Sequence, residues 1–481
     1  MSSDVAQAPS PDVAESPRRT DLRGLTDFAA TLQAGHIPAH ISELLKHCIL
    51  DTIGCMVGGV DTDVARTMHR MADTASIRSA GTSSVVASSG RLGPDLAALV
   101  NGTISHGLIF DDMHRTAKIH PGVFTVPAVL ALNDTQDVTG ADFLAAVCAG
   151  YETSSRLGIA INMSEHRARG WRATSTVGSL GAAAASARLL GLSPQQSHHA
   201  ASVAAAQASG SFAFADGGGM ELYLAAGTAA RNGVTAALAA EAGFRGAEDP
   251  LFAEDGGLFT GTSADTDAAV LTADLGLVFR LQEVCIKMRP TCHSTQTAID
   301  AALEIRAEHG IRINDVSKIV VEAGEITRLQ CGWDYHPATP ELMVFHMGFI
   351  LASILETGHV RSADLRGELL HDPEYVRIAK ATTVVAVDEL TAIYKTKKPS
   401  VVHIHLKDGR VLTSRVDFCK GDPENPATSA EVVAKFEELT SELLPVGDQH
   451  RIIDTVLDLE RQDSVRAIGS LIAGARRTAG L

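Results

Sequence analysis

The sequence predicts a mainly α protein in which a long helical part is followed by an α+β unit and a helical C-terminus. Apolar residues recur at three- and four-residue steps through most of residues 22–275. Runs of β-branched and alternating residues occur between about 275 and 420, and the helical pattern returns after Pro426. At 481 residues the chain is too long for one core, so two or three domains are expected.

The first part begins with ISELLKHCILDTIGCMV, residues 41–57, which has the apolar spacing of a helix buried on one side. Further helices are expected at residues 94–100, 123–132, 142–159, 176–190, 193–208 and 222–242. The run that starts at Gly178, GSLGAAAASARLLGL, consists almost entirely of small residues. Small residues allow neighbouring helices to approach closely, so we expect this run in the core.

The α+β unit has a β-branched segment, VSKIVVE, at residues 316–322. Residues 401–416 alternate around Asp408-Gly409, which predicts a β-hairpin. With helices at 295–308 and 340–355, these segments predict helices and a small antiparallel sheet. Two further helices are expected at 429–444 and 452–474, and they can pack back on the first part of the chain. The expected divisions are a disordered tail (1–20), a helical part (21–275), an α+β part (276–420) and a second helical part (421–481).

Composition excludes several classes of protein. The net charge of −16 argues against a nucleic-acid partner, which requires a concentrated basic surface. The seven cysteines are scattered without a CxxC pair, which favours reduced thiols over a disulfide framework or a zinc site. No apolar stretch reaches about 18 residues, so no membrane-spanning helix is expected. Residues 1–20 lack the pattern of a signal peptide, and we expect a cytoplasmic protein.

The stretch with the most chemistry is residues 101–132, NGTISHGLIFDDMHRTAKIHPGVFTVPAVLAL. Within fifteen residues it gathers two adjacent carboxylates, three imidazoles and two cations: Asp111, Asp112, His106, His114, His120, Arg115 and Lys118. Surface loops usually carry Lys and Glu, so this mixture beside strongly apolar flanks favours a lined pocket. The alternative is a solvated loop between two helices.

A second cluster is VCIKMRPTCH at residues 284–293, which places Lys287 and Arg289 among apolar residues. A lysine buried between Ile286 and Met288 would have a depressed pKa and could act as an acid or a base. The pattern is equally compatible with a lysine on an edge strand that points to solvent.

A third cluster, between Tyr151 and Arg172, is basic although the protein is acidic. Arginine binds carboxylates through two parallel hydrogen bonds, so the cluster suits a substrate with several carboxylates. Arg156 lies one helical turn after Glu152 and is expected to pair with it, which leaves Arg172 as the arginine with a functional role.

Common cofactor motifs are absent: the sequence contains no GxxxxGK[ST], HExxH or GxSxG, and no GxGxxG after a strand. Gly217-Gly218-Gly219 is expected to be a turn at a helix entry, and the adjacent His198 and His199 are not expected to form a metal site. Histidine and lysine bases together with arginine clamps favour abstraction of a proton next to a carboxylate. Elimination, decarboxylation and epimerisation all use such a step.

Several of these segments resemble the MmgE/PrpD family, which includes 2-methylcitrate dehydratase, cis-aconitate decarboxylase and iminodisuccinate epimerase. The resemblance covers nearly the whole chain, and its most specific parts are HGLIFDDMHRTAKIHPGVFTVPAVLAL, GYETSSRLG, GWRATSTVGSLGAAAA, GTAARNGVTAALAAEAGFRG and IKMRPTCHSTQTAIDA. CGW at Cys331 followed by HP at His336 is most similar to the fungal cis-aconitate decarboxylase branch.

The resemblance implies a large helical domain assembled from both ends of the chain and a smaller α+β lid domain inserted between them. It implies a site between the domains, a homodimer, and no cofactor or metal. His120 and Lys287 match the family's active-site histidine and lysine, and Tyr151 matches a pocket tyrosine. The family's acidic loop corresponds to Asp111, Asp112 and His114.

The sequence departs from the family pattern at four site positions. Ile109 replaces an acidic residue, Met113 replaces a threonine and Arg172 replaces a histidine. A lysine expected shortly before GTAARNG is missing, because the stretch around Leu222 contains no cation. The surviving pair of potential bases and the added arginine suit an epimerase or a lyase for a different polycarboxylate.

We therefore expect a cofactor-independent lyase, a dehydratase or decarboxylase, that abstracts an α-proton from a small di- or tricarboxylate. The alternatives are an epimerase of an iminodisuccinate-like compound and a non-catalytic homologue that binds a metabolite. Lys287 and His120 would exchange the proton, while Asp111 or Asp112 would orient His120 or His114. The expected catalytic residues are His120, Lys287, Asp111, Asp112 and Tyr151, and the expected substrate-binding residues are His114, Arg115, Arg172 and Arg289.

Overall fold

The computed structural model describes residues 21–78, 81–394 and 396–477, so the predicted tail at 1–20 lies outside the described residues. Helices account for 59% of the structure and strands for 9%, which confirms a mainly α fold. The α-helices are α1 (Asp21–Thr31), α2 (Ala39–Gly58), α3 (Asp63–Arg78), α4 (Pro94–Ser105), α5 (Gly122–Asn133), α6 (Gly140–Ala160), α7 (Met163–Ala168), α8 (Ala173–Leu189), α9 (Pro194–Ala206), α10 (Phe214–Gly217), α11 (Glu221–Glu241), α12 (Leu258–Thr262), α13 (His293–His309), α14 (Glu325–Cys331), α15 (Pro340–Met343), α16 (Met347–Thr357), α17 (Pro373–Lys380), α18 (Asp388–Ala392), α19 (Ser429–Thr440), α20 (Val446–Leu457) and α21 (Ala467–Ala473).

The centre of the helical part is a bundle in which α8 packs against α5, α6, α9 and α11, and α4 packs against α5 and α11. The small residues of α8 have the role that the sequence predicts. A Cβ atom added at Gly181 would lie 2.7 Å from Cβ of Ser154 on α6, and one added at Gly178 would lie 2.7 Å from the ring of Phe124 on α5. Side chains at these positions would force the helices apart, so glycine sets their spacing.

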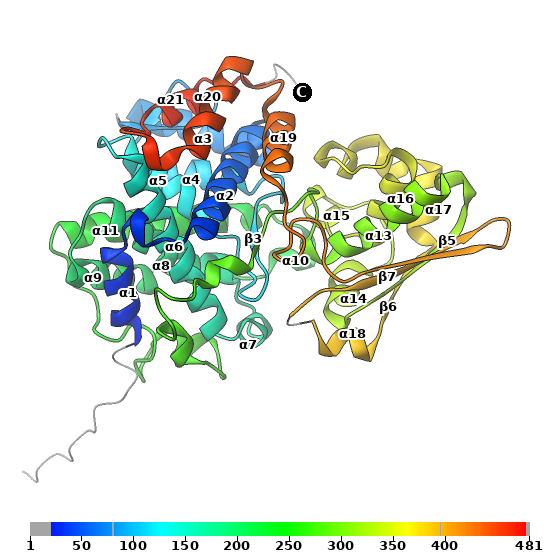
Figure 1. The fold of residues 1–481 in the computed structure, drawn as a ribbon, viewed down its shortest axis with the longest axis horizontal. Coiled ribbons are helices and arrows are strands. Elements are labelled where there is room, and N and C mark those ends of the chain that lie inside the picture. Colours follow the sequence, from blue (N-terminus) through cyan, green and yellow to red (C-terminus); the bar gives the residue numbers. More distant parts are fainter. Residues whose placement is uncertain (1–20, 79–80, 395, 478–481) are drawn as a thin grey trace, which may run out of the picture.

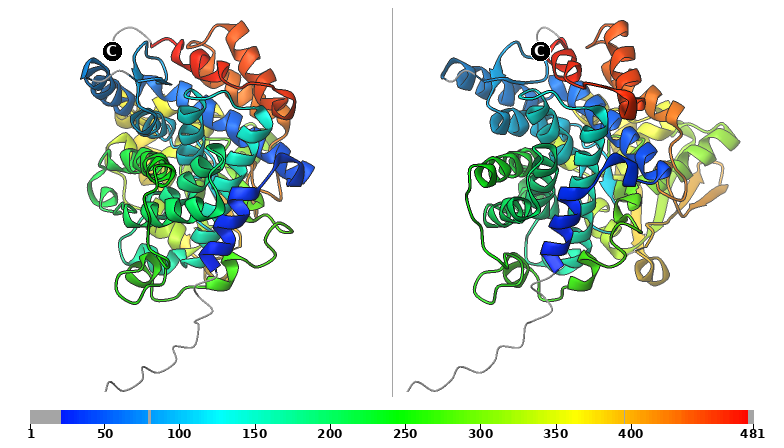
Figure 2. Two further views of the ribbon diagram at one scale, coloured as in Figure 1. Left: turned by 90° about the vertical axis from the view of Figure 1, so that its left-hand side faces the viewer. Right: turned by 60° about the vertical axis from the view of Figure 1, so that its left-hand side comes forward.

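The last helices pack against the first ones and not against the sheet (Figures 1 and 2). Helix α19 packs against α2, with Phe436 over Gly54, while α20 contacts α2 and α21 contacts α5. Helix α2 is therefore buried along most of its length, not on one side as its spacing predicts. The two ends of the chain share one hydrophobic core, and we retain the domain divisions near 275 and 420 as a proposal.

The four-stranded sheet has the order β6-β5-β7-β8, formed by β5 (Val316–Ala323), β6 (Thr382–Ala386), β7 (Ser400–Leu406) and β8 (Val411–Val416). Strands β7 and β8 form the predicted hairpin, with Gly409 in the left-handed region at φ 91°. The prediction of a purely antiparallel sheet is wrong, because β6 pairs with β5 in parallel. Helices α14 to α17 connect these two strands, and such a long crossover permits parallel pairing.

Two predicted helices are interrupted by tertiary contacts. The segment 340–355 divides into α15 and α16, because His346 accepts the amide of Phe349 and caps a new helix. The segment 452–474 is interrupted between α20 and α21, where Gln462 accepts the amide of Gly140 and Val465 donates to Val138. Among the described residues, no helix is long and apolar enough to cross a bilayer.

Two short two-stranded sheets complete the fold, one of β1 (Ser83–Ser84) and β2 (Arg91–Leu92), the other of β3 (Met113–His114) and β4 (Val284–Cys285). Met113 pairs with Cys285 and His114 pairs with Val284. This pairing brings the 284–293 segment beside the loop between α4 and α5. Two of the clusters found in the sequence therefore become neighbours.

Candidate active site

The loop between α4 and α5 is inside the protein. His106, Asp111, Asp112 and His114 have no exposed surface. The alternative of a solvated loop is therefore wrong. Ile109 adopts φ 51°, which is strained for a β-branched residue, and its carbonyl oxygen accepts a hydrogen bond from Lys287.

Asp111 lies between two imidazoles and organises the centre of this loop. Its Oδ1 is 3.0 Å from Nδ1 of His106, and its Oδ2 is 2.7 Å from Nδ1 of His120. Burial would raise the pKa of Asp111, but the interactions with the two imidazoles and with the nearby Lys287 outweigh it and hold the pKa well below its usual value. Asp111 is therefore an ionised carboxylate that orients both rings.

The tautomer of His106 follows from its partners. Its Nε2 lies 2.7 Å from Nη2 of Arg172, and a guanidinium can only donate. His106 therefore accepts at Nε2 and donates from Nδ1 to Asp111, so both of its nitrogens are used.

His120 has one nitrogen to spare. Nδ1 is held by Asp111, whereas Nε2 has no partner among the described residues and the side chain is 17% exposed. Burial lowers the pKa of His120 to about 3, so the ring is neutral at pH 7. A neutral imidazole held by a carboxylate, with its second nitrogen open, has the arrangement of a general base.

Lys287 approaches the loop from the segment that follows β4. Its ammonium group donates to the carbonyl of Ile109, and its side chain is 2% exposed. The alternative of a lysine that points to solvent is therefore wrong. Burial lowers the pKa of Lys287, and the nearby Asp111 partly opposes that shift. An ammonium with a depressed pKa can serve as an acid.

Arg172 stands at the start of α8. It donates to the Leu222 carbonyl (2.7 Å) as well as to His106, and its guanidinium carbon is 5.9 Å from the centre of the Phe214 ring. Burial lowers its pKa to about 10, so it stays charged at neutral pH. His106 therefore lies between the Asp111 carboxylate and the Arg172 cation.

Asp112 and Tyr151 form a separate buried pair. The Tyr151 hydroxyl donates to Oδ2 of Asp112 (2.8 Å), and the Gly122 amide donates to Oδ1 (3.0 Å). Burial and the charge of Asp51 raise the pKa of Asp112 to about 8, so it is protonated at pH 7. Neither side chain has exposed surface, and this placement favours a positioning role at the start of α5.

Three predicted substrate-binding residues have protein partners. His114 donates from Nε2 to the Arg280 carbonyl (2.8 Å) and accepts the Ala117 amide at Nδ1 (3.1 Å). Arg115 makes a bidentate ion pair with Glu424 at 2.7 and 2.9 Å. Arg289 donates to the Met288 carbonyl. For His114 the placement contradicts the prediction, because no ring nitrogen is left for a substrate.

The structure adds residues to which the sequence analysis gave no role. His293, the first residue of α13, donates from Nε2 to Oδ1 of Asp422 (3.1 Å), while Nδ1 lies 3.4 Å from Nζ of Lys398. Only His293 lies in a segment that the sequence singles out. Lys398 and Asp422 come from the segments that precede β7 and follow β8, and no local pattern distinguishes them.

A third lysine supports the centre from α19. Lys435 forms an ion pair with Asp51 of α2 (2.5 Å) and donates to the carbonyls of Phe110 and Lys287, both at 2.8 Å. Helix α19 thus holds the backbone at Phe110 and at Lys287, the two segments that the hydrogen bond from Lys287 to Ile109 joins.

The buried cations fall into two groups. Among the described residues, Lys46, Arg115, Arg156 and Lys435 are each paired with a carboxylate within 4 Å. Arg172, Lys287 and Lys398 are 6%, 2% and 5% exposed, and no carboxylate of the part of the chain that the structure describes lies within 4 Å of any of them. Buried charges are normally paired, so each of these three cations is a candidate contact for an anionic ligand.

Two buried groups have donor types that could hold a metal: His106, Asp111 and His120, and Cys285, His293 and Asp422. In the first group the Arg172 cation is 2.7 Å from a histidine nitrogen, and in the second the Lys398 cation is 3.4 Å from one. These cations would repel a metal ion at short range. We therefore interpret both groups as hydrogen-bonded clusters, and the expectation of no metal stays a prediction.

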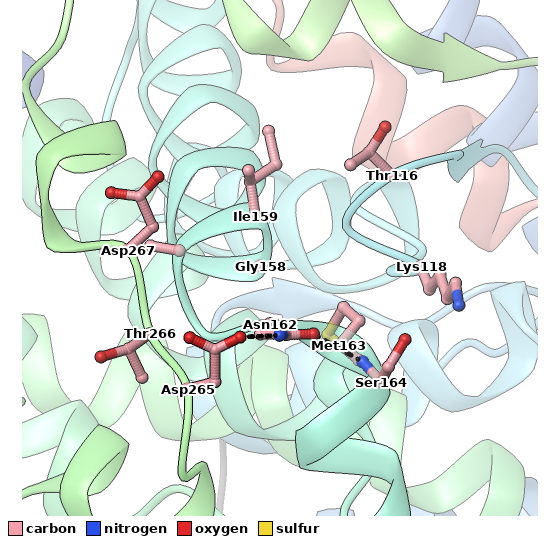
Figure 3. Close-up of a pocket in the computed structure, with 11 residues that line it drawn as sticks. Thr116, Lys118, Gly158, Ile159, Asn162, Met163, Ser164, Asp265, Thr266 and Asp267 are labelled. Carbon is pink, nitrogen blue, oxygen red and sulfur yellow. Dashed lines mark hydrogen bonds between the residues drawn. The ribbon is translucent and has the colours of Figure 1, made fainter. Parts of the chain in front are cut away.

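Two cavities lie near this centre. The smaller, of about 230 Å³, opens beside Thr116 and Lys118, next to the Asn162–Asp265 hydrogen bond (Figure 3). The larger, of about 360 Å³, lies between α10 and α15, with Phe214 in its wall. Neither is lined by His120 or Lys287, but the larger shares Phe214 with Arg172.

Comparison with known proteins identifies the family of the chain. The family model described as the MmgE/PrpD N-terminal domain matches residues 23–270, and the MmgE/PrpD C-terminal domain matches residues 290–461. The cis-aconitate decarboxylase-like protein oryM of Aspergillus oryzae is 28% identical over 94% of this chain and 96% of its own length. Cis-aconitate decarboxylases of Aspergillus terreus and Homo sapiens are 25% and 27% identical, over 92% and 94% of this chain and 94% and 95% of theirs.

Proposed function

The chain belongs to the MmgE/PrpD family, and we propose on that premise that it is a lyase that acts on a small di- or tricarboxylate without a cofactor. Relatives over nearly the full length of the chain are named cis-aconitate decarboxylases, which supports a decarboxylase or dehydratase. The departures at Ile109, Met113, Arg172 and Leu222 lead us to propose a substrate that differs from cis-aconitate.

The observation that carries the proposal is the set of three buried cations without carboxylate partners, Arg172, Lys287 and Lys398. An isolated buried charge is costly, so a bound polycarboxylate would supply the missing counter-charge. The same cations would stabilise the negative charge that develops when a proton leaves the carbon next to a carboxylate.

His120 and Lys287 divide the proton transfers. In a dehydration, Nε2 of His120 takes the C–H proton, the C–O bond breaks, and the departing hydroxide takes a proton from Lys287 to leave as water. In a decarboxylation, the C–C bond to the carboxylate breaks, carbon dioxide leaves, and the electron pair on carbon takes a proton from the acid. Asp111 holds His120 in the tautomer with an unprotonated Nε2, which the dehydration requires, and in the decarboxylation Lys287 is the acid.

The low pKa of His120 fits an anionic substrate. Burial is the main cause of the shift to about 3, and such a ring is a weak base. A carboxylate bound beside it would favour the imidazolium and raise the pKa again, because opposite charges stabilise each other. The base would thus gain strength when substrate is present.

Proton NMR of the purified protein in deuterated water with a panel of polycarboxylates tests the proposal. The panel holds citrate, 2-methylcitrate, cis-aconitate, malate, tartrates and iminodisuccinate stereoisomers. A new or vanishing olefin signal, or release of carbon dioxide, is the expected result. Loss of an α-proton signal without an olefin would indicate an epimerase, and stabilisation without exchange would indicate a binding protein.

Replacement of the two bases tests the residue roles. We expect His120→Asn and Lys287→Gln each to lower kcat, and the double variant to lose turnover. Turnover that survives in the double variant would contradict the assignment of these two groups.

The family also implies a homodimer. Light scattering on the purified protein should give twice the chain mass of 50.5 kDa, and a mass of one chain would contradict it.

A further inference from the structure

The larger cavity has a composition that a small polycarboxylate does not require. It is lined on one side by residues 167 and 212–215 of the helical part and on the other by residues of the segment 329–345, which includes the end of α14 and all of α15. Among the described residues that line it, none is acidic, and the Phe and Trp side chains are Phe212, Phe214, Trp333 and Phe345. Its volume of about 360 Å³ and its apolar walls are typical of a small-molecule pocket.

The cavity adjoins the catalytic centre through two wall residues. Phe214 lies 5.9 Å from the Arg172 guanidinium, which donates to His106. On the opposite wall, Leu342 follows Glu341, which is hydrogen-bonded to Tyr223, and the Tyr223 ring centre is 6.0 Å from that of His106. The cavity is therefore separated from Arg172 by one side chain, Phe214.

Packing holds the walls apart without a ligand. Phe212 and Phe214 are in contact at 4.7 Å, and Arg167 lies 3.6 Å above the Phe212 ring. On the other side Trp333 packs edge-on against His346 at 4.4 Å, and His346 packs against Tyr335 at 5.1 Å. Because Phe212, Phe214 and Trp333 are each held by another aromatic or cationic group, these three side chains are in place before a ligand binds.

We propose that the substrate carries an apolar substituent, an alkyl chain or aryl group, which occupies this cavity while Arg172, Lys287 and Lys398 bind its carboxylates. The inference rests on the proposed function and names the class of its substrate. Unsubstituted cis-aconitate has no apolar part to fill the space. The aromatic walls favour a hydrocarbon, and the absence of acidic groups among the described lining residues keeps the neighbouring carboxylates free of repulsion.

A chain-length series tests the proposal. The substrates are cis-aconitates that carry hydrogen, methyl, butyl or hexyl on the olefinic carbon. We expect kcat/KM to rise by about fourfold for each buried methylene. Turnover of the unsubstituted compound with no gain, or a loss, on lengthening would overturn this inference and leave the proposed function intact.

Substitutions of residues that line the cavity test whether the cavity causes the dependence of kcat/KM on alkyl-chain length. Trp333→Ala and Phe345→Ala should flatten the dependence on chain length, and Ala215→Phe should reverse it by filling the space. Phe244→Ala is the matched control, since Phe244 is 62% exposed and is not among the lining residues, and it should keep the wild-type slope. If all three cavity variants keep the wild-type dependence of kcat/KM on alkyl-chain length, the alkyl chain binds elsewhere and the proposal is overturned.

Calorimetric binding of alkylsuccinates, which cannot eliminate, separates this inference from the proposed reaction. Tighter binding with longer chains, lost in Ala215→Phe, would support the cavity assignment even if no compound in the series were turned over. Affinity that does not change with chain length would overturn it.

Discussion

The central residue is Asp111, whose two oxygens hold two histidines in different roles. Because Arg172 and Asp111 occupy both nitrogens of His106, only His120 has a nitrogen available for chemistry. This distinction depends on hydrogen-bond partners and not on the identity of the side chain.

His120 and His114 form a matched pair for a test, since both lie in the same loop. We expect His120→Asn to lower kcat by about a hundred- to ten-thousand-fold, the usual range for loss of a general base. His114→Asn should lower the free energy of unfolding by about 1 kcal/mol through its lost backbone bond and keep proton exchange. Exchange rates by NMR and urea unfolding measure the two effects, and equal losses of exchange would contradict the assignment.

The high pKa of Asp112 predicts a pH dependence of stability. Between its unfolded value near 3.8 and its folded value of about 8, the native state binds one more proton than the unfolded state, so this group's contribution falls as pH rises. Asp112→Asn removes that proton. The stability of the variant relative to wild type should therefore increase from pH 5 to pH 8 by more than about 1.4 kcal/mol, the equivalent of one pKa unit.

Urea unfolding of wild type and variant at both pH values measures this difference. The prediction concerns the free energy of unfolding and not the catalytic activity. A constant difference between wild type and variant at pH 5 and pH 8 would show that Asp112 is ionised in the native state.

At the scale of elements, the site depends on a helix that contributes no catalytic group. Helix α19 begins more than 300 residues after the catalytic loop, yet its Lys435 donates to Phe110 and Lys287 and pairs with Asp51. The N- and C-terminal helices are thus joined at the point where the loop is anchored.

Removal of one partner of this buried pair should be strongly destabilising. Lys435→Met leaves Asp51 buried and unpaired, and we expect a loss of about 3–5 kcal/mol in the free energy of unfolding. The double variant Asp51→Asn/Lys435→Met should recover part of that loss, because no charge is then left without a partner. Chemical denaturation of the two single variants and the double variant gives the coupling energy. A loss below 1 kcal/mol in Lys435→Met would contradict this account.

At the scale of the whole molecule, three distant segments meet at one place. The β3–β4 pairing, the Lys287–Ile109 hydrogen bond and the Arg115–Glu424 ion pair join residues 109–115, 284–287 and 419–424. These contacts connect the helical part to the sheet-bearing part through the site itself.

The two tryptophans allow a test of this connection, because Trp171 lies in the helical part and Trp333 in the sheet-bearing part. The variants Trp171→Phe and Trp333→Phe each keep one tryptophan, whose fluorescence follows the unfolding of the part in which it lies. We expect both variants to have the same midpoint of urea unfolding. Separate midpoints would show that the two parts unfold independently.

The sequence by itself determined the fold class and most helices, because apolar periodicity and small-residue runs are local properties. It also singled out His120, Lys287, Asp111 and Arg172 as candidate site residues, since they lie in segments with an unusual concentration of charge beside apolar flanks. The hairpin at Gly409 followed from turn chemistry alone.

Only the tertiary structure decided which groups remain available for chemistry. The parallel strand β6, the breaks before α16 and α21, and the partners Lys398, Asp422 and Lys435 depend on contacts between residues far apart in the sequence. The same holds for His114, whose Nε2 donates to the Arg280 carbonyl, and for Arg115, whose two Nη atoms donate to Glu424. The local sequence shows which chemical groups are present. Packing sets the hydrogen-bond partners and the burial of these groups, and these two factors determine their protonation and their role.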